Sequence, residues 1–236
     1  MQAILFDLDG TLLPMDIDIF TKGYFGLLTK KAAPYGYTPQ ALVDGIWTAT
    51  KAMVQNDGTM SNSDRFWEAF AARFGQRVYD DIPLFDAFYT HEFKEAVCYT
   101  QPAPQKAQSA VELAHAAADK VILATNPIFP LVGVETRLTW LGLHITDFDH
   151  ITSYENSRFC KPNPLYYEAL LNEYGLCAKD CLMVGNDVQE DIEPASAIGL
   201  QTYLLTDCMI NRANAAVCGM AGTFDELLHT LTELER

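Results

Sequence analysis

Short apolar segments that alternate with helical patterns are the feature that most restricts the fold of this chain. Four segments in the C-terminal half have strand character, at residues 121–124, 150–153, 182–184 and 202–205. Helical patterns separate and follow them, at residues 131–141, at 164–174, from the end of the third segment through Ala197, and at 224–235. Short apolar strands separated by helices form parallel sheets that are covered by helices on both faces.

The helix expected at residues 164–174 has the clearest boundaries. Asn163 is the predicted N-cap, Pro164 stands in the first helical position, and Gly175 follows the last turn. Each of these residue types is favoured at its position by backbone geometry and by the unpaired amide or carbonyl groups of a helix end.

The N-terminal residues supply a fifth strand. An apolar run that begins at residue 4 ends at Asp7 and Asp9, and Gly10 follows. We therefore expect an α/β fold with a doubly wound parallel sheet of five or more strands. An alternative reading takes Asp9-Gly10 as a tight turn that closes a hairpin between residues 4–8 and 11–13.

Residues 15–99 do not follow the strand–helix alternation. Apolar side chains recur there at helical spacing, as in Phe66, Phe70 and Phe74, and no strand pattern is evident. We predict a discontinuous core domain at residues 1–14 and 100–236, interrupted by an all-helical domain at residues 15–99.

Composition excludes several classes of protein. Hydrophobic residues make up 49% of the 236, which is enough for a substantial core, and the formal net charge is −15. An acidic surface disfavours nucleic acids and anionic membranes as partners. No apolar run reaches membrane-spanning length, and the N-terminus does not resemble a signal peptide.

The six cysteines form no C-x-x-C pair, so we expect reduced thiols in a cytoplasmic protein. They are Cys98, Cys160, Cys177, Cys181, Cys208 and Cys218.

Polar residues follow the predicted strands where each strand ends. Ligands of open parallel sheets bind at the carboxyl ends of the strands, so these side chains are expected to meet. Asp7 and Asp9 lie two residues apart, on the same side of an extended strand, and two carboxylates about 4 Å apart repel by roughly 4 kcal/mol at an effective dielectric near 20. Such a pair requires a cation, a shared proton or solvent. The other candidates are Thr125, Asn126, Lys161, Asp187 and Asp191.

These residue types agree in their chemistry. The four aspartates offer hard oxygen ligands of the kind that Mg²⁺ prefers, and Lys161 and Thr125 offer a cation and a hydroxyl to the oxygens of an anion. Each group also has a structural explanation. Thr125 and Asn126 could open a turn, Lys161 could be a solvated loop residue, and Asp187 with Glu190 could form a helix capping box that leaves Asp191 as a first-turn acid. Their joint occurrence at four strand ends favours a site.

The same residues match the motifs of a known family. The sequence resembles the haloacid dehalogenase-like hydrolase superfamily in all four motifs and in their order. Residues 7–12 (DLDGTL) resemble the first motif, Thr125 the second, Lys161 in Lys-Pro-Asn-Pro the third, and residues 185–187 with Asp191 the fourth. The helical insert resembles the cap of the subgroup that contains phosphoglycolate phosphatase and β-phosphoglucomutase.

The resemblance implies a Mg²⁺-dependent phosphatase that acts on a small phosphorylated metabolite. Asp7 would be the nucleophile that forms an aspartyl-phosphate, and Asp9 the general acid and base. The metal ligands would be the Asp7 carboxylate, the Asp9 backbone carbonyl and Asp187, and Asp191 would ligate directly or hold a metal-bound water. The phosphoryl oxygens would be held by Lys161, Thr125 and the backbone amides near Leu8 and Asn126.

Other functions remain open at this stage. A phosphomutase shares every core motif. Dehalogenases of the family usually lack the second aspartate, here Asp9, and a phosphonatase requires a desolvated cap lysine, for which Lys22, Lys30, Lys31 and Lys51 are candidates. A phospho-acceptor switch would be about half this length, and a catalytically silent binding protein would lack a motif residue. We expect a monomer or a homodimer.

Overall fold

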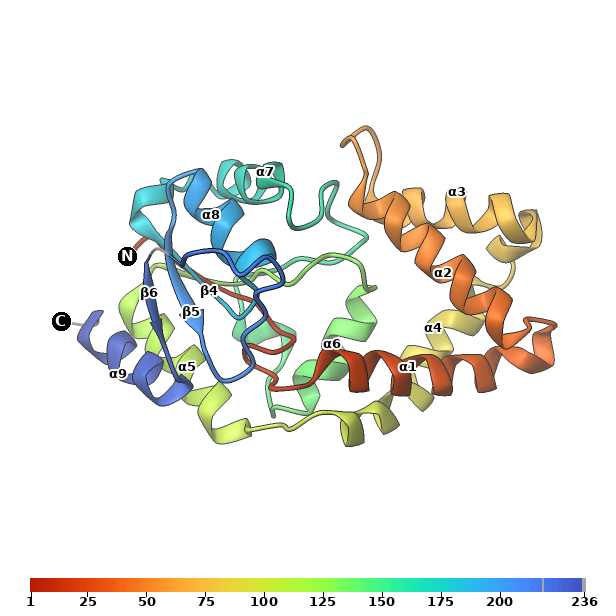
Figure 1. The fold of residues 1–236 in the computed structure, drawn as a ribbon, viewed down its shortest axis with the longest axis horizontal. Coiled ribbons are helices and arrows are strands. Elements are labelled where there is room, and N and C mark those ends of the chain that lie inside the picture. The colour runs from red at the N-terminus through yellow and green to blue at the C-terminus, as the bar shows by residue number, and fades with distance from the viewer. Residues whose placement is uncertain (218, 235–236) are drawn as a thin grey trace.

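The computed structural model describes residues 1–217 and 219–234. The prediction of a reduced thiol at Cys218 and the predicted end of the last helix at Glu235 lie outside the described residues. Figure 1 shows a sheet flanked by helices, with a group of long helices standing beside it.

A six-stranded sheet forms the centre of the core, and every strand pairing in it is parallel. The strand order is β3-β2-β1-β4-β5-β6. This confirms the predicted α/β fold with a doubly wound parallel sheet. The strands are β1 (Ala3–Phe6), β2 (Lys120–Leu123), β3 (His150–Ile151), β4 (Cys181–Gly185), β5 (Gln201–Leu205) and β6 (Met220–Gly222).

The hairpin alternative for Asp9-Gly10 is wrong. Strand β1 lies in the middle of the sheet, where Ile4 pairs with Val121 on one side and with Leu182 on the other. Residues 11–13 form a turn that touches Asp9 through a single isolated bridge. Both neighbours of β1 therefore come from distant parts of the chain.

Helices cover both faces of the sheet, as the alternation of β1 side chains shows. Ile4 and Phe6 belong to the larger hydrophobic cluster, whereas Ala3 and Leu5 belong to a second cluster on the opposite face. The first cluster includes side chains of α5 (Pro104–Ala117), α6 (Leu131–Thr139) and α9 (Phe224–Leu234). The second includes side chains of α7 (Pro164–Tyr174) and α8 (Glu193–Ala197).

Helix α7 has the predicted boundaries. The Asn163 side chain accepts a hydrogen bond from the Leu165 amide at 3.0 Å, Pro164 is the first helical residue, and Gly175 ends the helix with a φ of 63°. The helix expected between β4 and Ala197 instead begins as a π-helical turn (Val188–Ile192), which α8 continues. Single-turn helices at Ile145–Asp147 and Ala178–Asp180 complete the core.

The insert between β1 and α5 is helical throughout its regular structure. It contains α1 (Ile17–Ala32), α2 (Pro39–Val54), α3 (Asn62–Phe74) and α4 (Ile82–Thr90), and the 3₁₀ segments Ala33–Tyr35, Gln76–Tyr79 and Glu92–Tyr99. In Figure 1 these helices stand to one side of the sheet. We propose that residues 15–99 are the cap domain. None of the described helices is both long enough and apolar enough to cross a membrane.

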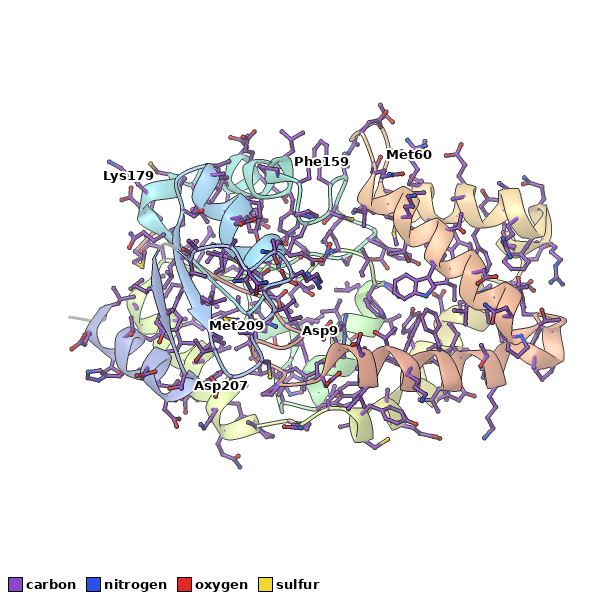
Figure 2. All side chains as sticks on the ribbon, in the orientation of Figure 1. Asp9, Met60, Phe159, Lys179, Asp207 and Met209 are labelled. Carbon is purple, nitrogen blue, oxygen red and sulfur yellow. The ribbon has the colours of Figure 1, made fainter. Side chains whose placement is uncertain are left out.

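Asn62, at the start of α3, joins the insert to the core. Its side chain is fully buried and donates to the Pro127 carbonyl at 3.2 Å, and its backbone amide donates to the Ser157 carbonyl at 2.8 Å. In Figure 2 the neighbouring insert residue Met60 and the core residue Phe159 are labelled where these two parts approach each other. These bonds fix one end of the insert relative to the sheet.

Candidate active site

Asp7 and Asp9 follow strand β1 and lie at the edge of the sheet formed by the carboxyl ends of the strands, which is called the rim below. The Asp7 amide donates to the Val184 carbonyl at 2.9 Å, so the sheet continues through this residue. The chain then turns at Gly10, whose φ is +86° and where a Cβ would overlap the Asn186 side chain. A side chain at position 10 is therefore excluded both by the backbone conformation and by the packing. In Figure 2 Asp9 lies between the sheet and the first insert helix.

Lys161 connects Asp7 with Asp191 beneath this rim. Its Nζ donates to Asp7 Oδ1 at 2.9 Å and to Asp191 Oδ1 at 2.6 Å, and the side chain is 1% exposed. Burial alone lowers the pKa of this ammonium group, but the two carboxylates hold it well above its ordinary value. Burial raises the pKa of Asp7 and the Lys161 charge opposes that shift. Lys161 therefore stays charged and fixes the orientation of the Asp7 carboxylate.

Asp9 is paired with Arg137, a residue that the sequence analysis did not select. Arg137 Nη1 donates to Asp9 Oδ2, Nε donates to the Gly133 carbonyl at 3.2 Å, and the guanidinium carbon lies 4.3 Å from the centre of the Phe129 ring. Burial raises the pKa of Asp9, and Arg137 opposes this shift. Asp9 Oδ1 and Arg137 Nη2 are buried without a partner among the described residues. One oxygen of Asp9 thus remains available to a ligand.

A signal for Arg137 does exist in the sequence. Helix α6 buries Val134 and Leu138 on one face, and Arg137 falls on that face at helical spacing. A charged residue on the buried side of a helix requires a partner, and here the partner is Asp9.

The Asp191 side chain holds the segment after β4 in place through hydrogen bonds to its backbone. Asp191 Oδ2 accepts hydrogen bonds from the amides of Asn186 and Asp187, at 3.1 and 3.0 Å. A Cβ at Gly185 would overlap the same oxygen, so glycine permits this close approach. Asp191 Oδ1 is held by the buried Lys161 and Oδ2 by two backbone amides, so the geometry favours an orienting role for Asp191 over direct contact with a metal.

Asp187 caps the helical turn that follows, but the capping box with Glu190 does not form, because the Asp187 amide donates to Asp191 Oδ2 and Glu190 accepts from Asn126 instead. Asp187 Oδ1 accepts hydrogen bonds from the amides of Gln189 and Glu190, at 2.9 and 3.1 Å. Its Oδ2 accepts from Arg212 Nη1 at 2.5 Å. Capping and a role in the site are compatible, because Oδ2 is held only by the Arg212 side chain, which is 57% exposed and can be displaced by a ligand, and Asp187 lines the cavity described below.

Arg212 is the second functional candidate that the sequence analysis missed. It lies in the loop after β5, and its amide donates to the Gln189 side chain at 2.9 Å, which brings the loop over the site. No helical or strand spacing marks a loop residue of this kind. Only the tertiary structure brings this cation to Asp187.

Thr125 and Asn126 follow β2 at the same rim. The Thr125 carbonyl accepts from the hydroxyls of Thr152 and Tyr166, at 2.7 and 3.1 Å, and its side chain lines the cavity. Asn126 Nδ2 donates to Glu190 Oε2 at 2.9 Å. Within the described part of the chain, the backbone amides of Leu8 and Asn126 donate to no acceptor. These two amides and the Thr125 hydroxyl are available to an anion.

A cavity of about 340 Å³ lies between this rim and the insert. Its floor includes Asp7, Asp9, Thr125 and Asp187, and its walls include side chains of α1, α2, α3 and α4. A ligand in this cavity would touch both the core and the insert. The structure therefore brings together all of the predicted site residues, with Lys161 buried directly below the rim.

The donors at the rim fit Mg²⁺ in type. In residues 1–217 and 219–234, no group of three or more His, Cys, Asp or Glu side chains has the arrangement of a metal site. Mg²⁺, however, keeps several waters and takes only one or two carboxylates together with substrate oxygens. Asp7 and Asp187 offer carboxylates to the same cavity, and the Asp9 carbonyl oxygen accepts no hydrogen bond from the described residues. All of these donors are hard oxygens.

Comparisons with known proteins found similar sequences and similar folds. A model of the haloacid dehalogenase-like hydrolase family matches residues 1–199. The ribulose-1,5-bisphosphate 5-phosphatase of Halopiger xanaduensis is 27% identical over 209 residues, which cover 86% of this chain and 83% of that protein.

Two solved structures show a similar fold. A predicted phosphoglycolate phosphatase from Haemophilus somnus has a TM-score of 0.58 and 19% identity, over 98% of this chain and 97% of that one. A 2-haloacid dehalogenase from Pseudomonas syringae has a TM-score of 0.63 and 18% identity, over 99% of both chains. At these identities the likeness concerns the fold alone.

Proposed function

The chain belongs to the haloacid dehalogenase-like hydrolase family, and from this premise we propose that it is a phosphatase that hydrolyses small phosphate monoesters with Mg²⁺. The observation that carries the proposal is the arrangement around Asp7. Its carboxylate is fixed by the buried Lys161, and it lines a cavity together with Asp9, Asp187 and Thr125.

Asp7 is the proposed nucleophile. Lys161 holds Oδ1, so the second carboxylate oxygen is free to attack phosphorus. In the first step an oxygen–phosphorus bond forms at Asp7 as the bond from phosphorus to the alcohol oxygen breaks. Water then attacks the phosphorus of the aspartyl-phosphate, which releases inorganic phosphate and restores Asp7.

Asp9 is the proposed general acid and base. It donates a proton to the leaving alcohol oxygen in the first step and accepts one from the attacking water in the second. Arg137 holds Oδ2 of this carboxylate, which leaves Oδ1 as the atom that exchanges the proton.

The phosphoryl group is held by donors that the rim already presents. The Thr125 hydroxyl and the amides of Leu8 and Asn126 are free to donate to its oxygens, and Lys161 offsets negative charge from below. Asp7, Asp187 and the Asp9 carbonyl are the residues that would hold Mg²⁺, with Asp191 supporting the segment that carries Asp187. When bound, the metal would neutralise phosphoryl charge.

The insert is proposed to act as a cap that excludes bulk water and contacts the leaving group. Its four longer helices contribute side chains to the cavity wall. Closing such a cap over the ester strengthens the electrostatic interactions inside and limits side reactions.

The proposed partner is a small phosphorylated metabolite, and the proposed location is the cytoplasm. The five cysteines that the structure describes are free thiols, as expected of a protein in a reducing compartment. A monomer or a homodimer remains our prediction for the oligomeric state.

A panel of phosphate monoesters tests the proposal. We expect phosphate release that requires Mg²⁺ and disappears on Asp7→Asn, with the circular dichroism spectrum unchanged. Metal-independent turnover, or full activity of Asp7→Asn, would refute the assignment of the nucleophile. In addition, Asp9→Asn should lower kcat/KM, which reports the first step, most strongly for esters with poor leaving groups, because only those need a proton donor. An equal loss on every ester would contradict the role of Asp9 as the acid.

A further inference from the structure

Aromatic side chains are the commonest kind in the lining of the active-site cavity. Ten of the side chains that line it are Phe, Tyr or Trp, and they come from both the insert and the core. On the insert side Trp47 of α2 lies 5.5 Å from Phe25 of α1, and Trp67 of α3 lies 5.6 Å from Phe85 of α4, measured between ring centres. On the core side Phe129 packs edge-on against Tyr24 at 5.6 Å.

Positive charge is scarce in the same cavity. Among the described residues that line it, Arg212 is the only cation, and it is bound to Asp187 at the catalytic rim. Away from that rim, the only charged side chain in the described lining is the carboxylate of Asp86, on α4. A second anionic group on the substrate would therefore leave water for an apolar wall and a like charge, which costs free energy.

We infer that the alcohol part of the substrate is an uncharged planar ring system of about nucleoside size, as in a nucleoside monophosphate. This inference rests on the proposed function and adds the class of leaving group. Sugar bisphosphates and phosphorylated carboxylic acids carry a second negative charge and are therefore not expected as substrates.

The size and exposure of the wall support a flat ring. The cavity of about 340 Å³ lies at the lower end of the range for small-molecule sites, ~300–1,000 Å³. Trp47 is 52% exposed although it lines the cavity, so part of its indole surface is open to a ligand. Stacking of a base on an aromatic side chain contributes about 1–3 kcal/mol, or roughly 5- to 150-fold in affinity.

The Asp86 carboxylate offers a polar contact to the proposed leaving group. Its side chain is exposed and belongs to the cavity lining, where a carboxylate accepts hydrogen bonds from N–H or O–H groups of an uncharged ligand. The same charge repels an anionic leaving group. A nucleoside offers donors of both kinds.

The first experiment compares kcat/KM for four esters with Mg²⁺: AMP, β-glycerophosphate, ribulose 1,5-bisphosphate and phosphocholine. We expect AMP to exceed each of the others by at least tenfold. A higher value for the bisphosphate would show that a second anion is accommodated, and a higher value for phosphocholine would show that the aromatic wall serves a cation. Either result would overturn the inference.

The second experiment uses a matched pair of variants. Trp47→Ala should lower kcat/KM for AMP by about 5- to 150-fold, mainly through KM, and should lower it less for β-glycerophosphate. Tyr35→Ala is the control, because Tyr35 is also in the insert and is 51% exposed but does not line the cavity. Equal effects of the two substitutions on AMP would contradict the stacking role.

A charge reversal tests the part played by Asp86. Asp86→Lys should raise kcat/KM for ribulose 1,5-bisphosphate by about tenfold relative to AMP, whereas Asp80→Lys, an exposed position outside the cavity, should not change that ratio. No change on Asp86→Lys would mean that leaving-group charge is not sensed at this position.

Binding to the Asp7→Asn variant separates this inference from the proposed function. Calorimetric titration should give tighter binding of AMP than of ribulose 1,5-bisphosphate, whether or not the wild-type chain hydrolyses either ester. If no phosphate monoester of the panel is hydrolysed but AMP binds more tightly, the proposed function fails and the ligand class stands. If the bisphosphate binds more tightly, the ligand class fails, whatever the activity.

Discussion

Two carboxylates of the site, Asp7 and Asp9, are each paired with a buried cation. The sequence requires some neutralising group for Asp7 and Asp9, and the structure supplies Lys161 for the first and Arg137 for the second. Both cations are almost completely buried. Each cation therefore depends on its carboxylate partner to compensate for lost hydration. The two ion pairs in turn hold the carboxylates of Asp7 and Asp9 in fixed positions.

Arg137→Met tests this dependence at Asp9. We expect the free energy of unfolding to fall by about 3 kcal/mol, the lower end of the range for a buried pair, because the substitution leaves a carboxylate that is only 18% exposed without its partner. The double variant Arg137→Met/Asp9→Asn should recover most of that loss, since no unpaired charge remains. Urea denaturation of the single and double variants gives the comparison.

Lys179→Met is the control for Arg137→Met. Lys179 is exposed and lies at the surface of the core in Figure 2. Its substitution should change the free energy of unfolding by less than about 0.5 kcal/mol. If the double variant is less stable than Arg137→Met alone, the two side chains are not coupled in the way proposed.

Cys160 illustrates how burial makes a thiol inert. It lies next to Lys161, but burial raises its pKa to about 12. The thiolate is the reactive form, and a raised pKa keeps the thiol protonated at every pH below that value. At pH 8 we expect iodoacetamide to modify the exposed Cys98 and Cys177 at least tenfold faster than Cys160, as measured by peptide mass spectrometry. Comparable rates would show that Cys160 is accessible.

The site residues that could be predicted are those that follow a buried strand. Asp7, Thr125 and Asp187 stand directly after apolar segments, and parallel topology brings those segment ends together. Arg212 could not be found in this way, because a flexible cation in a loop has no fixed spacing from any strand. Arg137 could have been found only by treating a charge on an apolar helix face as a sign of a buried partner.

At the level of elements, the strands that could be predicted from the sequence are the buried ones. Strands β1, β2, β4 and β5 are buried along most of their length and appear as apolar runs in the sequence. Strand β6 was not predicted, because two of its three residues are exposed and it lies at the edge of the sheet. The π-helical turn after β4 was also missed, since its backbone responds to the contacts of Asp187 and Asp191 rather than to a sequence period.

The start of α3 gives an element-scale prediction about how the insert is attached. The Asn62 side chain donates to the Pro127 carbonyl and to Cys160 Sγ, both in the core. Removing it leaves a buried carbonyl unpaired, at a cost of about 1–3 kcal/mol. We expect Asn62→Ala to lower the free energy of unfolding by that amount and to increase hydrogen exchange of amides in residues 55–66.

The matched control for Asn62→Ala is Asn172→Ala. Asn172 is an exposed asparagine in α7, so its removal should leave stability and exchange within error of the wild type. If exchange after Asn62→Ala rises equally in the sheet and in the insert, the effect is global and Asn62 does not act as a local attachment.

At the scale of the whole molecule, the excess of negative charge lies at the surface. The formal net charge is −15, and the buried charged side chains nearly balance one another, with Lys161 and Arg137 set against Asp7, Asp187 and Asp191. The surface therefore carries almost all of the excess negative charge. Repulsion among exposed carboxylates destabilises the compact state, and salt screens it.

This distribution predicts that KCl stabilises the protein. Between 0.01 and 0.1 M ionic strength the screening length falls from about 30 to 10 Å, which removes repulsion across the surface but affects the buried pairs much less. If the gain is on the order of 1 kcal/mol, Tm should rise by roughly 2–4 °C for a chain of this size. Calorimetry with EDTA present excludes an effect of bound divalent metal, and NaCl should give the same shift. A fall in Tm would mean that exposed ion pairs such as Lys106–Asp225 outweigh the repulsion.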